Sequence, residues 1–381
     1  MEIKVHTTIE AVPKDDWNGI VGPNRLICTH EYLSAIERSG INDCRFFYPA
    51  AYEGGRLVAH TCAYTISTEL DLFATGVLKK AIGRVRRFWP DFLILRSLEC
   101  GTPVALGSTF SFREGTDRAA ALGALRAAIE GIAEREGINV ILFRDFLDRE
   151  LPFYDSLLSF GYRRIHNLPG TRIDVTWKTF DQYLDSLRKR YRKEISLRKR
   201  KFQRDDVTVQ VVEDFTPHAA DLERLWFNVY DQAREYKRER LTKDFFMNIR
   251  QCLNGRSSVL LVKKGDRPVA FSLLLFDDET LIPLFCGLDY SLNEDYCLYF
   301  NLFYNIIALA GERDMRDIDL GITTLEPKKE IGAEVVTLHM YMKHRNPLFH
   351  LFVPRIFDAM TPQDNTPPKR VFKTDPETAH D

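Results

Sequence analysis

The sequence predicts an α/β protein with two similar halves, each built on a mixed central sheet flanked by helices. The clearest indication lies in the second half, where apolar runs at 269–276 and 281–288 are joined by Asp277-Asp278, as in a hairpin. A stretch of helical periodicity at 298–313 follows and leads into a short strand that ends at Gly321. The first half repeats this order of elements at low identity, so we expect two copies of one fold.

The elements of the first half follow from local signals. Gly54-Gly55 is typical of a hairpin turn, and Gly137 ends a strongly periodic helix. In order, we expect a strand at 3–8, a helix at 30–39, strands at 46–52 and 57–65, a helix at 119–136, a strand at 140–143 and a short helix at 153–160.

The second half starts after a junction near 167–180. Before the hairpin we expect a strand at 207–212, a helix at 219–235 and a strand at 258–263, where residues 263–266 form the hairpin tip. The end of the chain, from Thr361, is polar, contains four prolines and is predicted to be disordered. The predicted domains are therefore 1–170, which includes an insertion at 70–95, and 171–360, followed by a tail at 361–381.

Composition limits the classes of protein to consider. With 381 residues, 45% hydrophobic and 28% charged, the chain suits a globular protein of two domains. A net charge of −1 gives no global attraction to nucleic acid or membrane. The seven cysteines show no CxxC pair and no metal spacing, which indicates reduced thiols and no metal site. The start of the chain lacks the apolar core of a signal peptide, and no apolar run reaches 18 residues. We expect a cytoplasmic protein, with peripheral contact at the inner face of the membrane.

Four blocks of sequence carry a resemblance to a known superfamily. They are GDRPVAFSLLLFDDETLIPLFCGLDYSLNEDYCLYFNLFYNIIALAGERDMRDIDLG, TFDQYLDSLRKRYRKEISLRKRKF, YDQAREYKRERLTKDFF and DLGITTLEPKKEIGAEVVTLHMY. The first resembles the acyl-transferase domain of the GCN5-related N-acetyltransferase (GNAT) superfamily, and the others resemble its FemAB-like or BioF2-like branch. The similarity covers about 177–345 well and 1–176 more loosely. It implies tandem GNAT-like domains and a slot between two strands for a thioester.

A basic helix is predicted at 187–204. It holds ten Lys or Arg residues in 18 positions, and only Glu194 opposes them. This run is either a solvated helix face or a phosphate-binding element, and the resemblance places it near the substrate or cofactor. The predicted cofactor-binding residues are Arg190, Arg192, Lys193, Arg198, Lys328 and Lys329.

The insertion at 70–95 has the pattern of a basic amphipathic helix. Leu78, Ile82 and Val85 share a helical face with Trp89. The segment is either a helix that covers the core or one that lies at an anionic membrane surface. The predicted membrane-binding residues are Lys79, Lys80, Arg86, Arg87, Phe88 and Trp89.

The candidate catalytic residues are polar side chains at strand ends. N-acyl transfer needs a base for the attacking ammonium and a polarised carbonyl. His339 is the first candidate for the base and Glu99 the second, and Tyr290 follows the central strand of the second half. His339 also fits a histidine satisfied within the core. Cys100 is either a covalent acyl carrier or inert packing.

One expected signature is absent. Ordinary GNAT acetyltransferases have an Arg/Gln-x-x-Gly-x-Gly/Ala loop whose backbone amides bind pyrophosphate, and this sequence contains no such loop. The resemblance to the FemAB-like branch, whose members use varied donors, accommodates this departure.

The leading hypothesis is an N-acyltransferase. It would move an acyl group from acyl-CoA or acyl carrier protein to a lipidic amine, such as a sphingoid base as in bacterial ceramide synthases. Acyl-CoA would be a cosubstrate, with no bound cofactor. The alternatives are an aminoacyltransferase that uses aminoacyl-tRNA on a peptidoglycan precursor, and a phosphate-recognising or scaffold protein that has kept the fold and lost the chemistry.

Overall fold

The computed structural model describes residues 1–69, 84–85, 94–204, 206–233, 238–322, 324–361, 364 and 366–373. The chain forms two compact units, and each contains segments that are distant in sequence. The first unit contains Met1–Leu168, Ala233–Arg240 and Thr337–Pro362. The second unit contains Pro169–Gln232, Leu241–Val336 and Gln363–Asp381. The domain limits predicted from the sequence, 1–170 and 171–360, remain a prediction.

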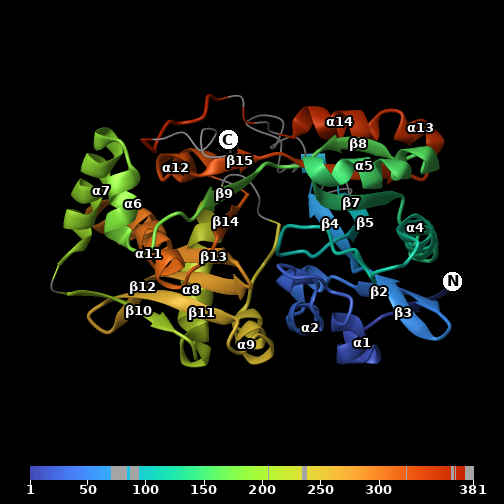
Figure 1. Ribbon diagram of the computed structural model, residues 1–381, viewed down its shortest axis with the longest axis horizontal. Helices are drawn as coiled ribbons and strands as arrows, with labels where there is room; N and C mark the ends of the chain where they lie inside the picture. Colours follow the sequence, from blue (N-terminus) through green and yellow to red (C-terminus); the bar gives the residue numbers. More distant parts are fainter. Residues whose placement is uncertain are drawn as a thin grey trace. The chain divides into compact units, whose positions relative to one another are not determined.

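The first unit is built on one sheet with the strand order β6-β3-β2-β4-β5-β7-β16-β8, and β1 pairs with β2 (Figure 1). Its strands are β1 (Glu2–His6), β2 (Phe46–Glu53), β3 (Arg56–His60), β4 (Ala63–Glu69), β5 (Ile94–Cys100), β6 (Ser111–Phe112), β7 (Val140–Leu147), β8 (Arg163–His166) and β16 (Leu338–His344). Its helices include α1 (Lys14–Asn18), α2 (His30–Arg38), α4 (Arg118–Arg135), α5 (Leu151–Tyr154), α13 (Pro347–His350) and α14 (Val353–Met360).

Helices pack on both faces of this sheet. Ile141 and Phe143 of β7 belong to the core that buries one side of α4. Val140 and Leu142, on the opposite face of the same strand, belong to the cluster against which α14 packs. Successive residues of a strand point to opposite faces, so β7 contributes to both cores.

Two elements of the first unit differ from their sequence predictions. The single strand expected at 57–65 is two strands, β3 and β4, because the pairing with β2 changes opposite Pro49. Proline has no N–H to donate to a ladder, and Thr61 N donates to Pro49 O at 3.1 Å where the two strands separate. His339, which falls within the predicted domain 171–360, lies on β16 of the first sheet, and this strand pairs with β7 and β8.

The second unit is built on a sheet with the order β10-β11-β12-β13-β14-β9-β15 (Figure 1). Its strands are β9 (Gly170–Asp174), β10 (Val207–Val212), β11 (Ser257–Lys264), β12 (Arg267–Asp277), β13 (Thr280–Leu288), β14 (Asp317–Gly321) and β15 (Glu334–Val336). Its helices are α6 (Phe180–Ser186), α7 (Lys189–Phe202), α8 (Ala219–Gln232), α9 (Lys243–Cys252), α10 (Tyr290–Tyr296), α11 (Leu298–Glu312) and α12 (Leu325–Glu330).

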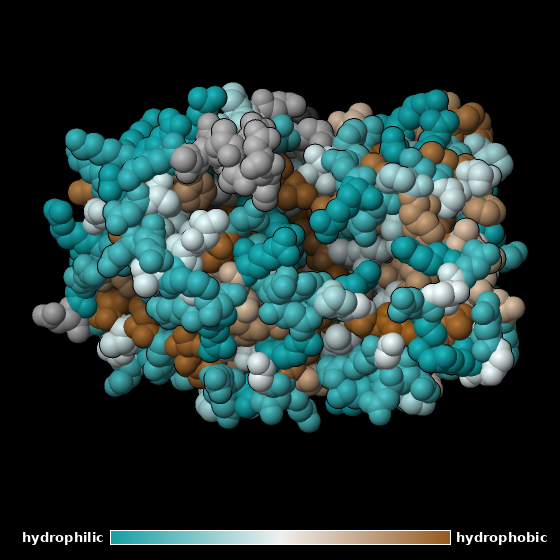
Figure 2. All heavy atoms as spheres, in the orientation of Figure 1, coloured by the Kyte–Doolittle hydropathy of each residue, from teal (hydrophilic) through white to brown (hydrophobic). Residues whose placement is uncertain are grey.

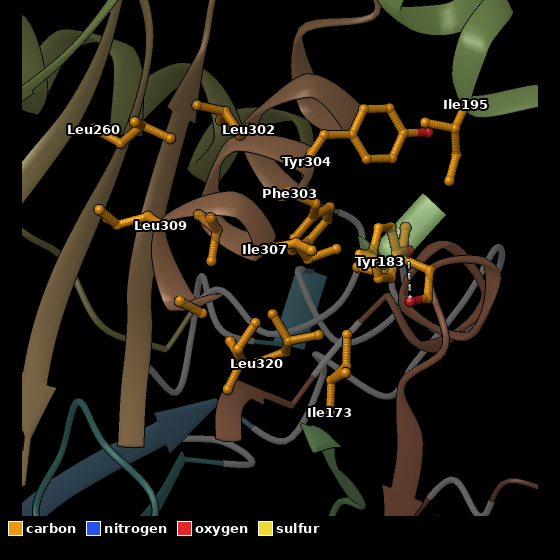
Figure 3. Packing of buried hydrophobic residues seen from close by; sticks show 14 of the residues in the cluster. Ile173, Tyr183, Ile195, Leu260, Leu302, Phe303, Tyr304, Ile307, Leu309 and Leu320 are labelled. Atoms are coloured by element: carbon orange, nitrogen blue, oxygen red, sulfur yellow. Dashed lines mark hydrogen bonds between the residues drawn. The ribbon is translucent and has the colours of Figure 1, made fainter. Parts of the chain in front are cut away.

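The core of the second unit surrounds α11. This helix is apolar on most of its circumference, and a helix with that pattern is buried rather than amphipathic. Figure 3 shows Leu302, Phe303 and Ile307 of α11 within the cluster that also contains Leu260 of β11 and Tyr183 of α6. The opposite face of the sheet meets α9, where the rings of Phe271 and Phe246 lie 5.6 Å apart.

Gly287 lets α8 approach β13 closely. A Cβ at this position would lie 2.6 Å from the carbonyl carbon of Leu225 and 2.7 Å from the amide nitrogen of Trp226, and it would also overlap the ring of Phe271. We expect Gly287→Ala to destabilise the protein by about 3 kcal/mol, because backbone atoms of α8 would have to move. Urea denaturation measures the effect. As a control, Gly123→Ala in α4 meets nothing within 4 Å and is expected to be neutral or mildly stabilising.

The α/β fold class is confirmed. Each sheet contains one parallel pair among otherwise antiparallel neighbours, β5 with β7 and β13 with β14. The tail differs in part from the disorder predicted for it, since Val371 is buried and its carbonyl accepts a hydrogen bond from Arg188 N at 3.0 Å.

Candidate active site in the second unit

The strands β13 and β14 pair at only two positions before they separate. The registered pairs are Thr280 with Asp317 and Leu281 with Ile318, both at the start of the two strands. Beyond them, β14 bonds to β9 on its other side. The next five residues of β13, from Ile282 to Cys286, are apolar yet only partly buried. The edges of the two strands therefore diverge toward their carboxyl ends, and we call this opening the splay.

Lys328 of α12 places an ammonium group at the splay. Its side chain is 4% exposed, and Nζ donates to Ile322 O at 2.8 Å and to Gly321 O at 3.3 Å. Burial lowers the pKa of Lys328 to about 8, against smaller opposing effects of Asp319 and Cys286. Because Lys328 interacts with Cys286 of β13 and with Asp319 of β14, it lies within reach of both separating strands.

Asp319 and Cys286 complete the polar centre of the splay. Burial raises the pKa of the Asp319 carboxyl, although its Oδ1 accepts a hydrogen bond from Gly321 N at 2.9 Å. Burial also raises the pKa of the Cys286 thiol to about 11, so that the thiol is neutral near pH 7. The arrangement combines one cation, one carboxyl group of raised pKa and an apolar strand edge.

Two tyrosines face the same centre. Tyr290 begins α10, directly after β13, and is 41% exposed. Tyr299 is in the first turn of α11, and its hydroxyl is 3.0 Å from Thr324 Oγ1. Burial raises the pKa of each phenol, and the neighbouring Cys286 raises both further. Both hydroxyls are therefore neutral hydrogen-bonding groups near pH 7.

The helix start beside the splay departs from a GNAT phosphate cradle. The residue before α11, Cys297, has a left-handed backbone with φ of 49°. The N–H of Tyr299, which a phosphate could otherwise bind, donates to Asn293 Oδ1 at 3.0 Å. The occupied amide at the start of α11 agrees with the absence of the glycine-rich, pyrophosphate-binding loop from the sequence.

Apart from Lys328, the predicted cofactor-binding residues divide into two groups. Arg198 reaches toward α11 and α12: it donates to Glu330 at 2.9 Å and to Tyr304 Oη at 3.3 Å, and it stacks on Phe300. Lys329 is 2% exposed and forms an ion pair with Asp364 at 2.5 Å. These two cations have acidic partners within the fold.

The remaining predicted cations lie on the outer part of α7. Arg190 lies 5.9 Å from the ring centroid of Tyr191, and Arg192 forms a 3.4 Å ion pair with the exposed Asp185. Lys193 is exposed, and within the described part of the chain it has no ion-pair partner. Lys328 and Tyr290 each interact electrostatically with Cys286 of β13, whereas this outer group lies on the exposed part of α7.

Glu99 and Cys100 lie at the end of β5 in the first unit. Glu99 is buried, and its Oε2 accepts from Arg238 at 2.5 Å, Tyr64 at 2.7 Å and Arg144 at 2.8 Å. These partners outweigh burial and lower the pKa of Glu99 to about 2, so its carboxylate is a weak base. Burial raises the pKa of Cys100 to about 12, which suits inert packing better than an acyl carrier. Their catalytic roles stay predictions.

His339 lies on β16 of the first unit. Its Nε2 is 2.7 Å from Asp148 Oδ1, and its ring lies 5.5 Å from that of His166, the register neighbour on β8. His339 thus has a carboxylate partner, as a general base often does. Its role as the base also stays a prediction.

The predicted membrane-binding residues lie outside the described residues. These are Lys79, Lys80, Arg86, Arg87, Phe88 and Trp89. Across the described parts of the chain, the helices are too short or too polar to span a bilayer.

Sequence reasoning missed two residues of the candidate site. It placed the end of a short strand at Gly321, but it treated Cys286 only as one of seven cysteines and passed over Tyr299. Their positions in the sequence could have indicated them. Cys286 is near the end of β13, and Tyr299 is in the first turn of α11.

Comparison with known proteins identifies the family. The FemAB-like family model, described as peptidoglycan biosynthesis and recognition, matches residues 8–350. The chain belongs to the FemAB-like family. The predicted resemblance to this branch is thereby confirmed.

Curated relatives of this FemAB-like chain occur in Mycobacterium tuberculosis. Proteins of strains CDC 1551 / Oshkosh and H37Rv, provisionally named 8-amino-7-oxononanoate synthase 2, are each 27% identical over 331 residues, or 84% of this chain. The match covers 42% of each relative, so the chain spans less than half the length of these proteins.

Solved structures share the fold at low identity. FemX has a TM-score of 0.56 and 14% identity, with 92% of this chain and all of that chain covered. The C-terminal domain of a protein from Agrobacterium fabrum, provisionally named lysylphosphatidylglycerol synthetase, has a TM-score of 0.53 at 13% identity, covering 91% of this chain and 95% of that one. A tandem GNAT protein from the clavulanic acid biosynthesis pathway has a TM-score of 0.50 at 10% identity, covering 91% and 99%. Family membership and these structures together give the FemAB-like chain a tandem GNAT-like fold.

Proposed function

We propose that the protein is an N-acyltransferase whose second unit carries the chemistry. The observation that carries this proposal is the Lys328 ammonium at the splay between β13 and β14. An activated acyl group would lie along the partly buried apolar edge of β13, with its carbonyl oxygen near Lys328 Nζ. The acceptor amine would attack that carbonyl.

Lys328 has a hydrogen-bond donor to spare for the reaction. An ammonium group has three N–H donors, and Lys328 uses two of them on Gly321 O and Ile322 O. The third can stabilise the negative charge that develops on the acyl oxygen as the amine attacks. Because Lys328 is buried, this charge is stabilised more strongly than it would be in water.

Asp319 is the proposed base that takes a proton from the acceptor ammonium, so that the free amine can attack the thioester carbonyl. The C–S bond then breaks, and the donor leaves as a thiol that carries away a second proton from the nitrogen. Asp319 lies on β14 beside Lys328, and burial raises the pKa of its carboxyl toward the working range of a general base. One oxygen is held by Gly321 N, which leaves the other available. His339 and Glu99 remain candidates predicted from the sequence, each with a carboxylate or cation partner in the first unit.

The proposed donor is a thioester and the proposed acceptor a lipidic amine. The apolar residues 282–286 suit an acyl chain, and the occupied amide of Tyr299 argues against the pyrophosphate contact of ordinary GNAT acetyltransferases. Acyl-CoA or acyl carrier protein would then be a cosubstrate held in another manner, with the cations of α7 near its phosphates. The residues 79–89 would collect the lipid at the membrane.

A second candidate is an aminoacyltransferase that uses aminoacyl-tRNA. The description of the family and the similarity in fold to FemX support it. The exposed cations of α7 would in this case meet the phosphates of the tRNA.

A matrix of donors and acceptors tests both candidates. Purified protein is incubated with acyl-CoA or aminoacyl-tRNA and with sphingoid bases or a peptidoglycan precursor, and the amide product is detected by mass spectrometry. We expect amide from acyl-CoA and a sphingoid base. Product from aminoacyl-tRNA alone would select the second candidate, and an absence of product with every pair would contradict both.

A further inference from the structure

The helices that follow β16 expose a concentration of large apolar side chains. Five of the nine residues from 348 to 356 are apolar and between 46% and 64% exposed: Leu348, Phe349, Leu351, Phe352 and Ile356. Single exposed apolar residues are normal, but a contiguous group usually marks an interaction surface. Figure 2 shows brown surface at the upper right, where Figure 1 places α13.

The fold does not need these side chains for its own core. Val353 and Phe357, on the other side of α14, pack against Val140, Leu142 and Met340 of the sheet. The helix is therefore anchored by one apolar side, while Phe352 and Ile356 extend a second apolar side into solvent. This second side is available to a partner.

Two arginines lie near the exposed apolar group. Arg163 of β8 and Arg355 of α14 have no acidic partner within the described part of the chain. Burial lowers the pKa of His350, and the nearby cations Arg163 and Lys343 lower it further. The one acidic residue of α14, Asp358, accepts hydrogen bonds from His166. The surroundings thus favour an anionic partner.

We propose that this α13–α14 surface, formed by Leu348, Phe349, Leu351, Phe352 and Ile356 with Arg163 and Arg355, docks on an anionic phospholipid bilayer. The apolar side chains enter the headgroup region while the arginines meet lipid phosphates. A second copy of the chain fits less well, because a two-fold contact would bring Arg355 against Arg355. A nucleic acid would leave the apolar centre without a partner. This proposal does not rest on the proposed function.

Vesicle co-sedimentation of the full chain tests the proposal. We expect wild type to bind vesicles that contain phosphatidylglycerol more tightly than pure phosphatidylcholine vesicles, and less tightly as salt is raised. The double substitution Phe352→Ser with Ile356→Ser is expected to weaken binding by about tenfold or more, because two large side chains no longer enter the bilayer. Phe227→Ser is the matched control, since Phe227 is 44% exposed on α8 of the second unit.

Circular dichroism and thermal unfolding establish that each variant is folded. Arg355→Glu tests charge separately: it should weaken binding to phosphatidylglycerol vesicles and leave binding to phosphatidylcholine unchanged. The proposal is overturned if wild type does not sediment with vesicles, or if Phe227→Ser weakens binding as much as the double substitution. It is also overturned if binding depends only on Lys79 and Arg86, or if the double substitution lowers the mass in solution from dimer to monomer.

Discussion

Replacing Lys328 by methionine is expected to lower the rate of acyl transfer by about a hundredfold or more while the protein stays folded. Methionine fills a similar volume but has no donor for the oxyanion, and it leaves Gly321 O and Ile322 O without their hydrogen bonds from Nζ. Single-turnover kinetics with the active donor and acceptor pair measures the effect on chemistry. Lys178→Met is the control, because Lys178 is 70% exposed and distant in role.

The pH profile separates two roles for Lys328. If the ammonium stabilises the oxyanion, transfer should decrease as pH rises through about 8, the pKa of this buried group. If the neutral amine of Lys328 were instead the general base, the rate of transfer would increase over the same pH range. A rate that Lys328→Met leaves unchanged would remove the lysine from the mechanism.

The same pKa predicts a dependence of stability on pH. The folded protein holds the Lys328 proton less tightly than the unfolded chain, whose lysine has the usual value of 10.5. Stability should therefore rise as pH increases from about 8 to about 10.5, and this gap corresponds to roughly 3 kcal/mol. Urea denaturation across this range should show the rise in wild type and its loss in Lys328→Met.

Local sequence signals were sufficient for the central hairpin strand and the buried helix of the second unit. The predicted runs at 281–288 and 298–313 match β13 (Thr280–Leu288) and α11 (Leu298–Glu312) within one residue, because a short apolar run and a stretch of helical periodicity are signals carried by neighbouring residues. The pairing of β16 with β7 could not be predicted in this way. It joins Leu338 to Leu147, and hydrogen bonds between segments so distant in sequence leave no periodic signal.

The candidate site was only partly predictable for the same reason. A charged Lys328 after a strand end was visible in the sequence, but its low pKa depends on burial against β13 and β14. Glu99 shows the reverse case. The sequence suggested that Glu99 is a base. The three partners that keep it ionised, residues 64, 144 and 238, are distant in the sequence and could not be read from it.

Glu99→Gln is expected to destabilise the first unit by about 4 kcal/mol, because it leaves buried arginines without their carboxylate. Arg144 is 8% exposed, and its remaining acidic neighbour, Asp145, is 3.7 Å away. Arg238 loses its charged partner at 2.5 Å, and its remaining acidic neighbour, Glu239, is 3.8 Å away. Urea denaturation gives the total effect, and hydrogen exchange of the β5 and β7 amides localises it. Glu10→Gln, in the exposed pair with Arg38, is the control and should cost less than about 1 kcal/mol.

Acid titration provides an independent measurement of the same ion pair. The folded pKa of Glu99, about 2, lies below the value of 4.5 for an unpaired glutamate. Its contribution is therefore complete above pH 4.5 and is lost as pH falls toward 2, a change of roughly 3 kcal/mol. Glu99→Gln should be less sensitive to pH in this range than wild type. If the variant kept full stability and lost only turnover, Glu99 would be the catalytic base that the sequence suggested, and the structural role argued from its three partners would be wrong.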